Sequence, residues 1–171
     1  LDSEPVGENV YLNVINNSID YCWFMSPYLV LSDEISRALG IAAKRGVDVR
    51  IMTPGIPDKK LAYSVTRSYY NHLIRSGVKI FEYTPGFNHT KSCISDDRCA
   101  VVGTINLDFR SLYHHFENAV YMCDVDCIPD IKKDFDDTFA ECRDVTEKYR
   151  VKGNIFIRFI KSVLRLIAPM M

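Results

Sequence analysis

The stretch from His89 to Asn106 holds the side chains best suited to chemistry. His89 and Lys91 are two residues apart, so on a β-strand both side chains would lie on one face. An imidazole can attack a phosphodiester phosphorus and form a phosphohistidine, which splits one difficult displacement into two easier ones. Such a transfer mainly requires positioning and charge neutralisation, so Lys91, Thr104 and Asn106 are candidates to hold the phosphate oxygens.

The residues that follow Lys91 predict a hairpin. Asp96 and Asp97 suit a tight turn, and the apolar run Cys99–Val102 has the character of a strand. This run ends at Gly103, after which a loop is expected. The alternative interpretation is a hairpin that carries a histidine and a lysine on its solvent face by chance.

The complete pattern H-x-K-x-x-x-x-D followed by G-T-x-N resembles the signature of the phospholipase D superfamily. The resemblance extends to Glu117 in the run HFENAV. It implies that the carboxylate of Glu117 binds the second imidazole nitrogen of His89, fixes its tautomer and stabilises the imidazolium. It also implies that Asp96 lies beside the catalytic groups as a structural partner, not as the base.

Composition predicts one globular domain with a sizeable core, since 47% of the 171 residues are hydrophobic and 25% are charged. The formal net charge of -1 gives no bulk basic field, so no nucleic-acid partner is expected. Six cysteines without a C-x-x-C pair favour a reduced compartment, with the cysteines acting as small apolar residues. Zinc is the alternative, but its candidate ligands are poorly spaced: His114, His115, Cys123 and Cys127. No metal or organic cofactor is expected, because histidine and lysine suffice for the reaction.

The pattern of apolar residues predicts alternating helices and strands. Helices are expected at 9–19, 33–44, 61–75 and 128–148, and strands at 21–25, 47–52, 78–83, 99–102 and 116–122. This rhythm favours an α/β fold with a mainly parallel sheet and helices on its faces.

Four longer runs are similar to the second catalytic domain of bacterial cardiolipin synthases: SPYLVLSDEI, RGVDVRIMTPGIPDKK, RSYYNHLIRSGVKIFEYTPGFNHTK and GTINLDFRSLYHHFEN. The similarity runs from about residue 8 to the C-terminus. It implies a phospholipase D-like mixed, largely parallel sheet sandwiched between helix layers. It also implies phosphatidyl transfer: one anionic phospholipid, expected to be phosphatidylglycerol, donates its phosphatidyl group to an active-site histidine. A glycerol hydroxyl of a second lipid accepts it, which gives cardiolipin.

The same resemblance places Arg67 near the substrate pocket and allows Tyr28 to line its entry. Lys59 and Lys60 could attract anionic head groups, or they could simply be the solvated start of a helix. The sequence departs from the family at His115, where the family often has asparagine. A histidine that points into the site there would change the pKa of His89 or the fit of the head group.

Residues 1–150 are expected to form the catalytic domain, and residues 151–171 a basic amphipathic tail helix. Arg158, Lys161 and Arg165 share one stripe of an otherwise apolar segment, which suits the interface of an anionic membrane. The alternative is a tail packed on its own or on an upstream domain. No apolar run is long enough to span a membrane. A start at Leu1 reads as part of a longer chain, so any spans would lie upstream. The resemblance implies a place at the bacterial cell membrane, either facing the cytoplasm or associated with the membrane.

Two other classes of function remain open. One is a different enzyme of the superfamily, either a hydrolytic phospholipase or a homodimeric nuclease, and the other is a non-catalytic membrane-binding domain. The superfamily mechanism uses two histidines, whereas the H-x-K pattern occurs once here. His72, His114 and His115 lack a lysine at the required spacing. The second motif is therefore expected from an upstream domain or a second copy. With an upstream domain, His89 is expected to be the general acid/base.

Overall fold

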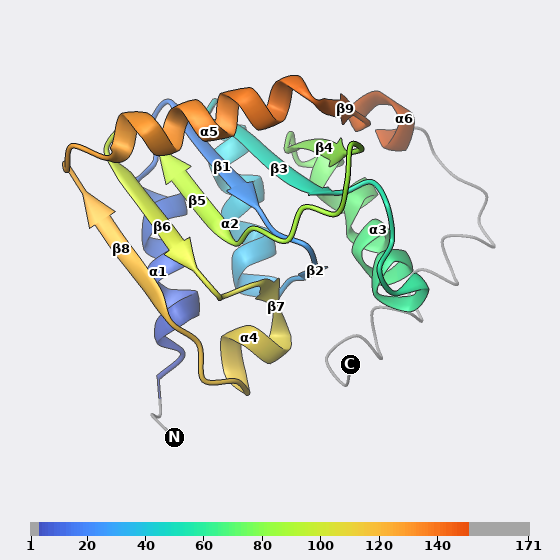
Figure 1. The fold of residues 1–171 in the computed structure, drawn as a ribbon, viewed down its shortest axis with the longest axis horizontal. Coiled ribbons are helices and arrows are strands. Elements are labelled where there is room, and N and C mark those ends of the chain that lie inside the picture. The colour runs from blue at the N-terminus through green and yellow to red at the C-terminus, as the bar shows by residue number, and fades with distance from the viewer. Residues whose placement is uncertain (1–3, 151–171) are drawn as a thin grey trace.

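The computed structural model describes residues 4–150. Its strands are β1 (Tyr21–Met25), β2 (Leu29–Val30), β3 (Asp48–Pro54), β4 (Lys79–Tyr83), β5 (Ser92–Ser95), β6 (Cys99–Gly103), β7 (Leu107–Asp108), β8 (Ala119–Cys123) and β9 (Cys142–Asp144). Its helices are α1 (Val6–Asn17), α2 (Asp33–Lys44), α3 (Lys60–Arg75), α4 (Phe109–Tyr113), α5 (Ile128–Ala140) and α6 (Thr146–Arg150). Figure 1 shows the arrangement of these elements.

The central sheet of this part of the chain has the strand order β8-β6-β5-β1-β3-β4-β9, and β2 pairs separately with β7. The predicted mixed α/β fold is confirmed. Parallel pairing joins β1, β3 and β4, while β5, β6, β8 and β9 pair antiparallel with their neighbours. The sheet therefore has more antiparallel pairs than the strand–helix rhythm predicts, because hairpin connections follow Lys91 where helical crossovers precede it.

The predicted turn at Asp96 and Asp97 is also confirmed. Both residues have positive φ angles, 55° and 52°, and they join β5 to β6. Two-residue hairpin turns with positive φ at both positions match the twist of the flanking strands, and aspartate tolerates that conformation.

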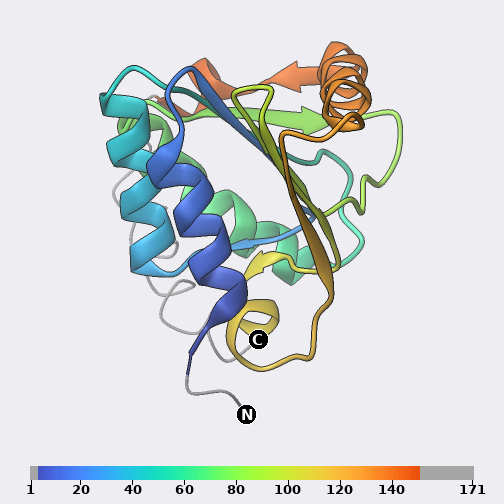
Figure 2. The same ribbon diagram turned by 90° about the vertical axis from the view of Figure 1, so that its left-hand side faces the viewer.

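Helix layers cover both faces of the sheet, as predicted. α1, α2 and α3 lie on one face and α5 lies on the other (Figure 2). The five residues of β1 are all buried and divide between the two cores. Cys22 and Phe24 join the core under α1, α2 and α3, whereas Trp23 packs against Phe135 and Phe139 of α5. A central strand buried on both faces reads as a continuous apolar run.

Local signals explain where α2 begins. The hydroxyl of Ser32 accepts a hydrogen bond from the backbone N–H of Ile35 at 3.2 Å, and two acidic residues follow in the first turn. This arrangement satisfies a free backbone donor and complements the helix dipole. Gly46, with a φ of 101°, follows the helix and turns the chain into β3.

The predicted helix at 128–148 is wrong beyond Ala140. The amphipathic pattern ends with Phe139, which packs on the sheet, and the next residues form β9 at the sheet edge. A short helix, α6, follows, and its Thr146 hydroxyl accepts a hydrogen bond from the N–H of Ile80 at 3.0 Å. The residues after Ala140 have helix-forming character, but pairing with β4 makes three of them an edge strand.

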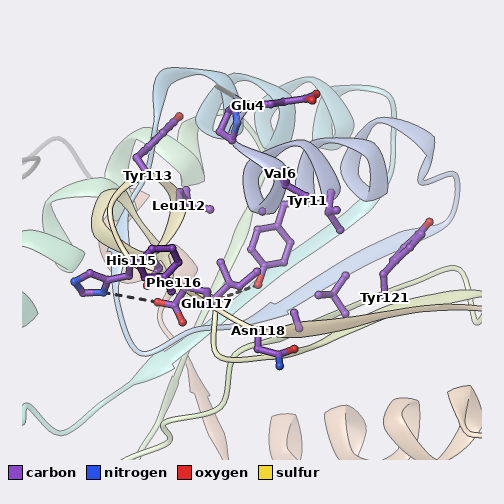
Figure 3. Close-up of a pocket in the computed structure, with 17 residues that line it drawn as sticks. Glu4, Val6, Tyr11, Leu112, Tyr113, His115, Phe116, Glu117, Asn118 and Tyr121 are labelled. Atoms are coloured by element: carbon purple, nitrogen blue, oxygen red, sulfur yellow. Dashed lines mark hydrogen bonds and ion pairs between the residues drawn. The ribbon is translucent and has the colours of Figure 1, made fainter. Parts of the chain in front are cut away.

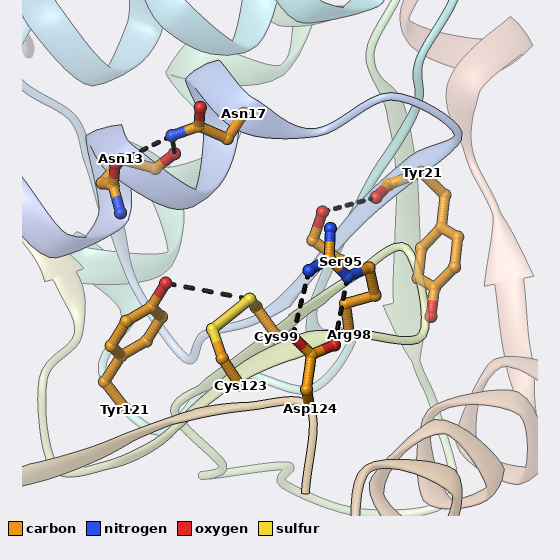
Figure 4. Close-up of a disulfide and its surroundings, with 9 residues drawn as sticks. All are labelled: Asn13, Asn17, Tyr21, Ser95, Arg98, Cys99, Tyr121, Cys123 and Asp124. Atoms are coloured by element: carbon orange, nitrogen blue, oxygen red, sulfur yellow. Dashed lines mark hydrogen bonds and ion pairs between the residues drawn. A yellow bond between two sulfur atoms is a disulfide. The ribbon is translucent and has the colours of Figure 1, made fainter.

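The cysteines are not all unpaired, which corrects the expectation drawn from their spacing. Cys99 and Cys123 face each other in the β6–β8 register and form a disulfide (Figure 4). Cys123 is consequently no thiolate ligand for zinc. Within residues 4–150, no group of histidine, cysteine and acidic side chains is arranged to hold a metal ion. Cys22 and Cys93 are buried as small apolar residues, as predicted.

The expected tail helix at 151–171 lies outside the described residues. Within residues 4–150, no helix is long and apolar enough to cross a membrane.

Candidate active site

His89 and Lys91 lie in an extended segment immediately before β5, not within a strand as the two-residue spacing predicts. Ser92 pairs with Met25, the last residue of β1, so the segment lies just beyond the carboxyl end of that strand. Asn88 anchors it there: its amide donates hydrogen bonds to the sulfurs of Met25 and Met52 at 3.9 and 3.5 Å. Strand β5 begins at Ser92, one residue after Lys91, so loop contacts position the histidine and the lysine instead of strand geometry.

The two side chains influence each other electrostatically. Burial and then the charge of Lys91 lower the pKa of His89, while the carboxylate of Asp58 opposes that shift. Burial also lowers the pKa of Lys91, and Glu117 and Asp108 oppose it. His89 therefore keeps its neutral, proton-accepting form to a lower pH than a free histidine side chain in water, which suits a nucleophile or a base.

We expect Lys91→Met to raise the pKa of His89, because the substitution removes a positive charge that disfavours the imidazolium. The measurement is an NMR titration of the His89 ring resonances in both proteins. Lys60→Met, at an exposed lysine that does not contribute to the shift, is the matched control and should leave the titration midpoint unchanged. An unchanged midpoint in Lys91→Met would contradict the proximity of the two groups.

Glu117 lies immediately before β8 and binds Thr104 and His115. The hydroxyl of Thr104 donates to Oε2 of Glu117, and Nδ1 of His115 lies 3.8 Å from Oε1 (Figure 3). The backbone N–H of Thr104 donates to the carbonyl of Asn118, and the N–H of Asn118 donates to the hydroxyl of Thr104. These bonds hold the two residues together where β6 ends and β8 begins. Within residues 4–150, no hydrogen bond joins Glu117 to His89, so the expected role of this carboxylate on the imidazole stays a prediction.

The pair formed by His115 and Glu117 lines a broad pocket of about 770 Å³ between the start of α1, α4 and β8 (Figure 3). Phe116 lies between them in sequence and is 95% exposed. The departure from the family at His115 therefore places an imidazole next to Glu117.

Asn106 and Tyr28 lie together on a smaller cavity of about 350 Å³. The side-chain amide of Asn106 donates to Ser111 Oγ at 3.1 Å, and its carbonyl oxygen is buried without a partner among the described residues. The β2–β7 pair aligns Leu29 with Leu107 and so brings the two segments side by side. A strand pairing of two residues thus assembles one wall of the site.

Tyr28 carries a feature that the sequence did not indicate. Its hydroxyl donates a hydrogen bond to the carboxylate of Asp58, and burial together with this bond raises the pKa of Tyr28 to about 12. Burial alone would raise the pKa of Asp58. The hydrogen bonds from the Tyr28 hydroxyl and the Lys59 N–H outweigh it and lower that pKa. Asp58 is therefore a fixed negative charge near His89, and no spacing in the sequence links these residues.

Asp96 does not lie beside the catalytic groups, which corrects the expectation from the resemblance. Its carboxylate accepts hydrogen bonds from the backbone N–H groups of Ile19, Asp20 and Tyr21 at 2.8 to 2.9 Å. These residues lead into β1, whereas Lys91 lies at the other end of that strand. The intervening β5 separates Asp96 from Lys91 by roughly 15 Å at about 3.4 Å per residue. Asp96 fixes the hairpin turn to the start of β1.

Arg67 has a partner within the fold. Its guanidinium donates to Oε1 of Glu82 at 2.6 and 3.0 Å, and Arg143 binds the other oxygen at 2.8 Å. Glu82 is fully buried, and a buried carboxylate requires such partners. The structure thus gives Arg67 a task in holding α3 to β4, and its expected contact with substrate stays a prediction.

The same fold occurs in solved structures. Nuc, a phospholipase D family member from Salmonella typhimurium, has a TM-score of 0.70 and 23% identity, over 80% of this chain and 89% of Nuc. A phosphatidylserine synthase from Haemophilus influenzae has a TM-score of 0.73 and 12% identity, over 96% of this chain and 44% of the synthase. At these identities the likeness concerns the fold alone, and that fold is of the phospholipase D class.

The chain belongs to the family described as "Cardiolipin synthase, PLD-like domain", whose model matches residues 11–141. It is 35% identical to cardiolipin synthase 2 of Bacillus cereus over 96% of this chain and 32% of that protein. It is 52% identical to an uncharacterized protein of Streptococcus mutans over its full length and 37% of that protein. The chain thus spans about a third of the length of the curated relatives that it matches. The predicted family is confirmed.

Proposed function

We propose that this chain carries one half of the active site of a phosphatidyltransferase that makes cardiolipin from two phosphatidylglycerol molecules. The observation that supports this most is the shared environment of His89 and Lys91 beyond the end of β1. Burial and the charge of Lys91 lower the pKa of His89, and Lys91 lies in the field of Glu117 and Asp108. An imidazole beside an ammonium group suits attack on, or proton transfer at, an anionic phosphodiester.

The reaction proceeds in two displacements. In the first, one histidine nitrogen forms a bond to phosphorus, the bond from phosphorus to the glycerol head group breaks, and a second histidine protonates the departing oxygen. In the second, the glycerol hydroxyl of another lipid gives up its proton to that second histidine and attacks phosphorus, and the phosphorus–nitrogen bond breaks. His89 fills one of the two histidine roles, and a motif outside this chain's single H-x-K pattern supplies the other.

Three further side chains complete this half of the site in our proposal. Lys91, Thr104 and Asn106 neutralise and position the non-bridging oxygens of the phosphodiester. The hydroxyl of Thr104 binds Glu117, and the buried side-chain oxygen of Asn106 has no partner within residues 4–150. With the amide turned over, its NH2 group would take that place and donate to a phosphate oxygen. The substrates are phospholipids at a bacterial membrane surface. Neither a metal nor an organic cofactor takes part, and nucleic acid is not the substrate.

The test is product analysis with the complete protein. Vesicles that contain phosphatidylglycerol labelled in its acyl chains should yield labelled cardiolipin and free glycerol in equal amounts. A hydrolytic phospholipase would release phosphatidate and glycerol instead, since water replaces the acceptor hydroxyl. Phosphatidate without cardiolipin would contradict the proposal. The absence of both cardiolipin and phosphatidate would favour the non-catalytic alternative.

A further inference from the structure

The smaller cavity beside Asn106 has no role in the proposed reaction apart from Asn106 itself. It lies between the first turns of α3, the β2 strand and α4, and its volume is about 350 Å³. This volume falls at the lower end of the range of small-molecule pockets. The cavity therefore has room for part of a substrate beyond the phosphate group itself.

The cavity lining combines apolar and polar side chains. The apolar ones are Val30, Leu61, Ala62, Val65 and Phe109. The polar or charged ones include Lys59, Asn106, Asp108, Arg110, Ser111 and His115. Leu61 is 53% exposed, so the apolar part of the lining reaches the protein surface. A pocket with both polar and apolar lining fits an amphiphilic molecule better than a sugar or a nucleotide.

The polar part of the lining is continuous with the phosphate-binding groups. Ser111 Oγ either accepts from the amide of Asn106, as it does here at 3.1 Å, or donates to its carbonyl if the amide turns over. In both orientations one polar atom of Asn106 has no partner among the residues that the structure describes. Buried polar groups are normally satisfied, so this atom is available to a phosphodiester oxygen or a glycerol hydroxyl of a ligand.

We propose that this cavity binds the acyl-bearing glycerol end of a phospholipid while its phosphodiester lies at Asn106 and Lys91. The inference rests on the proposed function, because it assigns the apolar part of the same substrate. The ester-linked chains lie along Leu61, Ala62 and Phe109 and leave the protein where Leu61 is exposed. The cavity thereby makes the enzyme select an acylated phosphodiester over the same phosphodiester without acyl chains.

Binding measurements on the complete protein carrying His89→Ala test the proposal without turnover. The probes are dihexanoyl-phosphatidylglycerol, kept below its micelle concentration, and glycerophosphoglycerol, which shares the phosphodiester but lacks acyl chains. Calorimetry should show at least tenfold tighter binding of the acylated probe, since burying two methylene groups is worth about that factor. Equal affinities for the two probes would overturn the proposal.

Ala62→Phe should then fill the apolar part of the cavity and weaken binding of the acylated probe at least tenfold, with no change for glycerophosphoglycerol. Ser64→Phe, an exposed position on the same helix that does not line the cavity, is the matched control and should change neither affinity. Leu61→Asp gives a second test at a half-exposed side chain, in case Ala62→Phe does not fold. Equal weakening of both probes in folded variants would also overturn the proposal.

The result is separable from that of the transfer reaction. If vesicle assays give no cardiolipin but the acyl-dependent binding persists, the proposed function fails and the lipid subsite stands. If cardiolipin forms but binding is indifferent to the acyl chains, the proposed function stands and the subsite fails.

Discussion

His89→Ala in the complete protein is expected to abolish cardiolipin formation, with a loss of at least about 10²- to 10⁴-fold, the usual contribution of a positioned acid or base. The fold should survive, because His89 is exposed and its ring lies at the surface beside that of Phe87, at 5.7 Å between centroids. Substitutions at such surface positions typically change the free energy of unfolding by about 0.5 kcal/mol or less. The measurements are the transfer assay and the melting temperature.

His114→Ala is the matched control for this substitution. His114 is also exposed and lies at the end of α4, outside the residues assigned to the reaction. It should retain near wild-type transfer and the same melting temperature. A His89→Ala protein that melts early but is fully active per folded molecule would show that the histidine has a structural role, and the assignment of the site would be wrong.

The parts of the site that could be predicted from the sequence are those encoded locally. The H-x-K spacing, the turn at Asp96 and Asp97, and the glycine and asparagine that follow lie within one continuous stretch. The buried strand at 21–25 was also predictable, because a run of apolar residues bounded by polar ones is typical of a central strand. Family resemblance then supplied Glu117, which no periodicity indicates.

The contacts that could not be predicted join residues far apart in the chain. Tyr28 meets Asp58 because β2 and the loop after β3 converge, and Arg67 meets Glu82 because α3 packs beside β4. The Cys99–Cys123 disulfide follows from strand register, which cysteine spacing does not reveal. In each case the sequence shows two side chains with no evident relation, and tertiary packing alone makes them partners.

Asp96 shows a different limit of sequence reasoning. Its place in the H-x-K-x-x-x-x-D pattern suggests that it belongs with His89 and Lys91, since the pattern treats all three as one unit. The structure separates them by the length of β5 and turns Asp96 toward the backbone at the start of β1. A motif can thus join chemical and architectural requirements within a few residues.

The chain alone is expected to be inactive, or nearly so, as a monomer. An in-line displacement places the attacking and leaving groups on opposite sides of phosphorus, so one imidazole cannot serve both. The three other histidines do not form a second H-x-K pattern. His115 is close to Glu117, and His72 and His114 lie on or next to α3 and α4. A second histidine must therefore come from another domain or from a second copy of this chain.

Transfer by the chain of residues 1–171, measured across a range of concentrations together with its mass by light scattering, separates these sources. If another domain supplies the second motif, the isolated chain stays inactive at every concentration. If a second copy supplies it, activity rises with the dimer, and mixing in excess His89→Ala chains suppresses it because each mixed dimer contains a single His89. Full turnover by a proven monomer would refute the half-site argument, since a single imidazole would then complete both displacements.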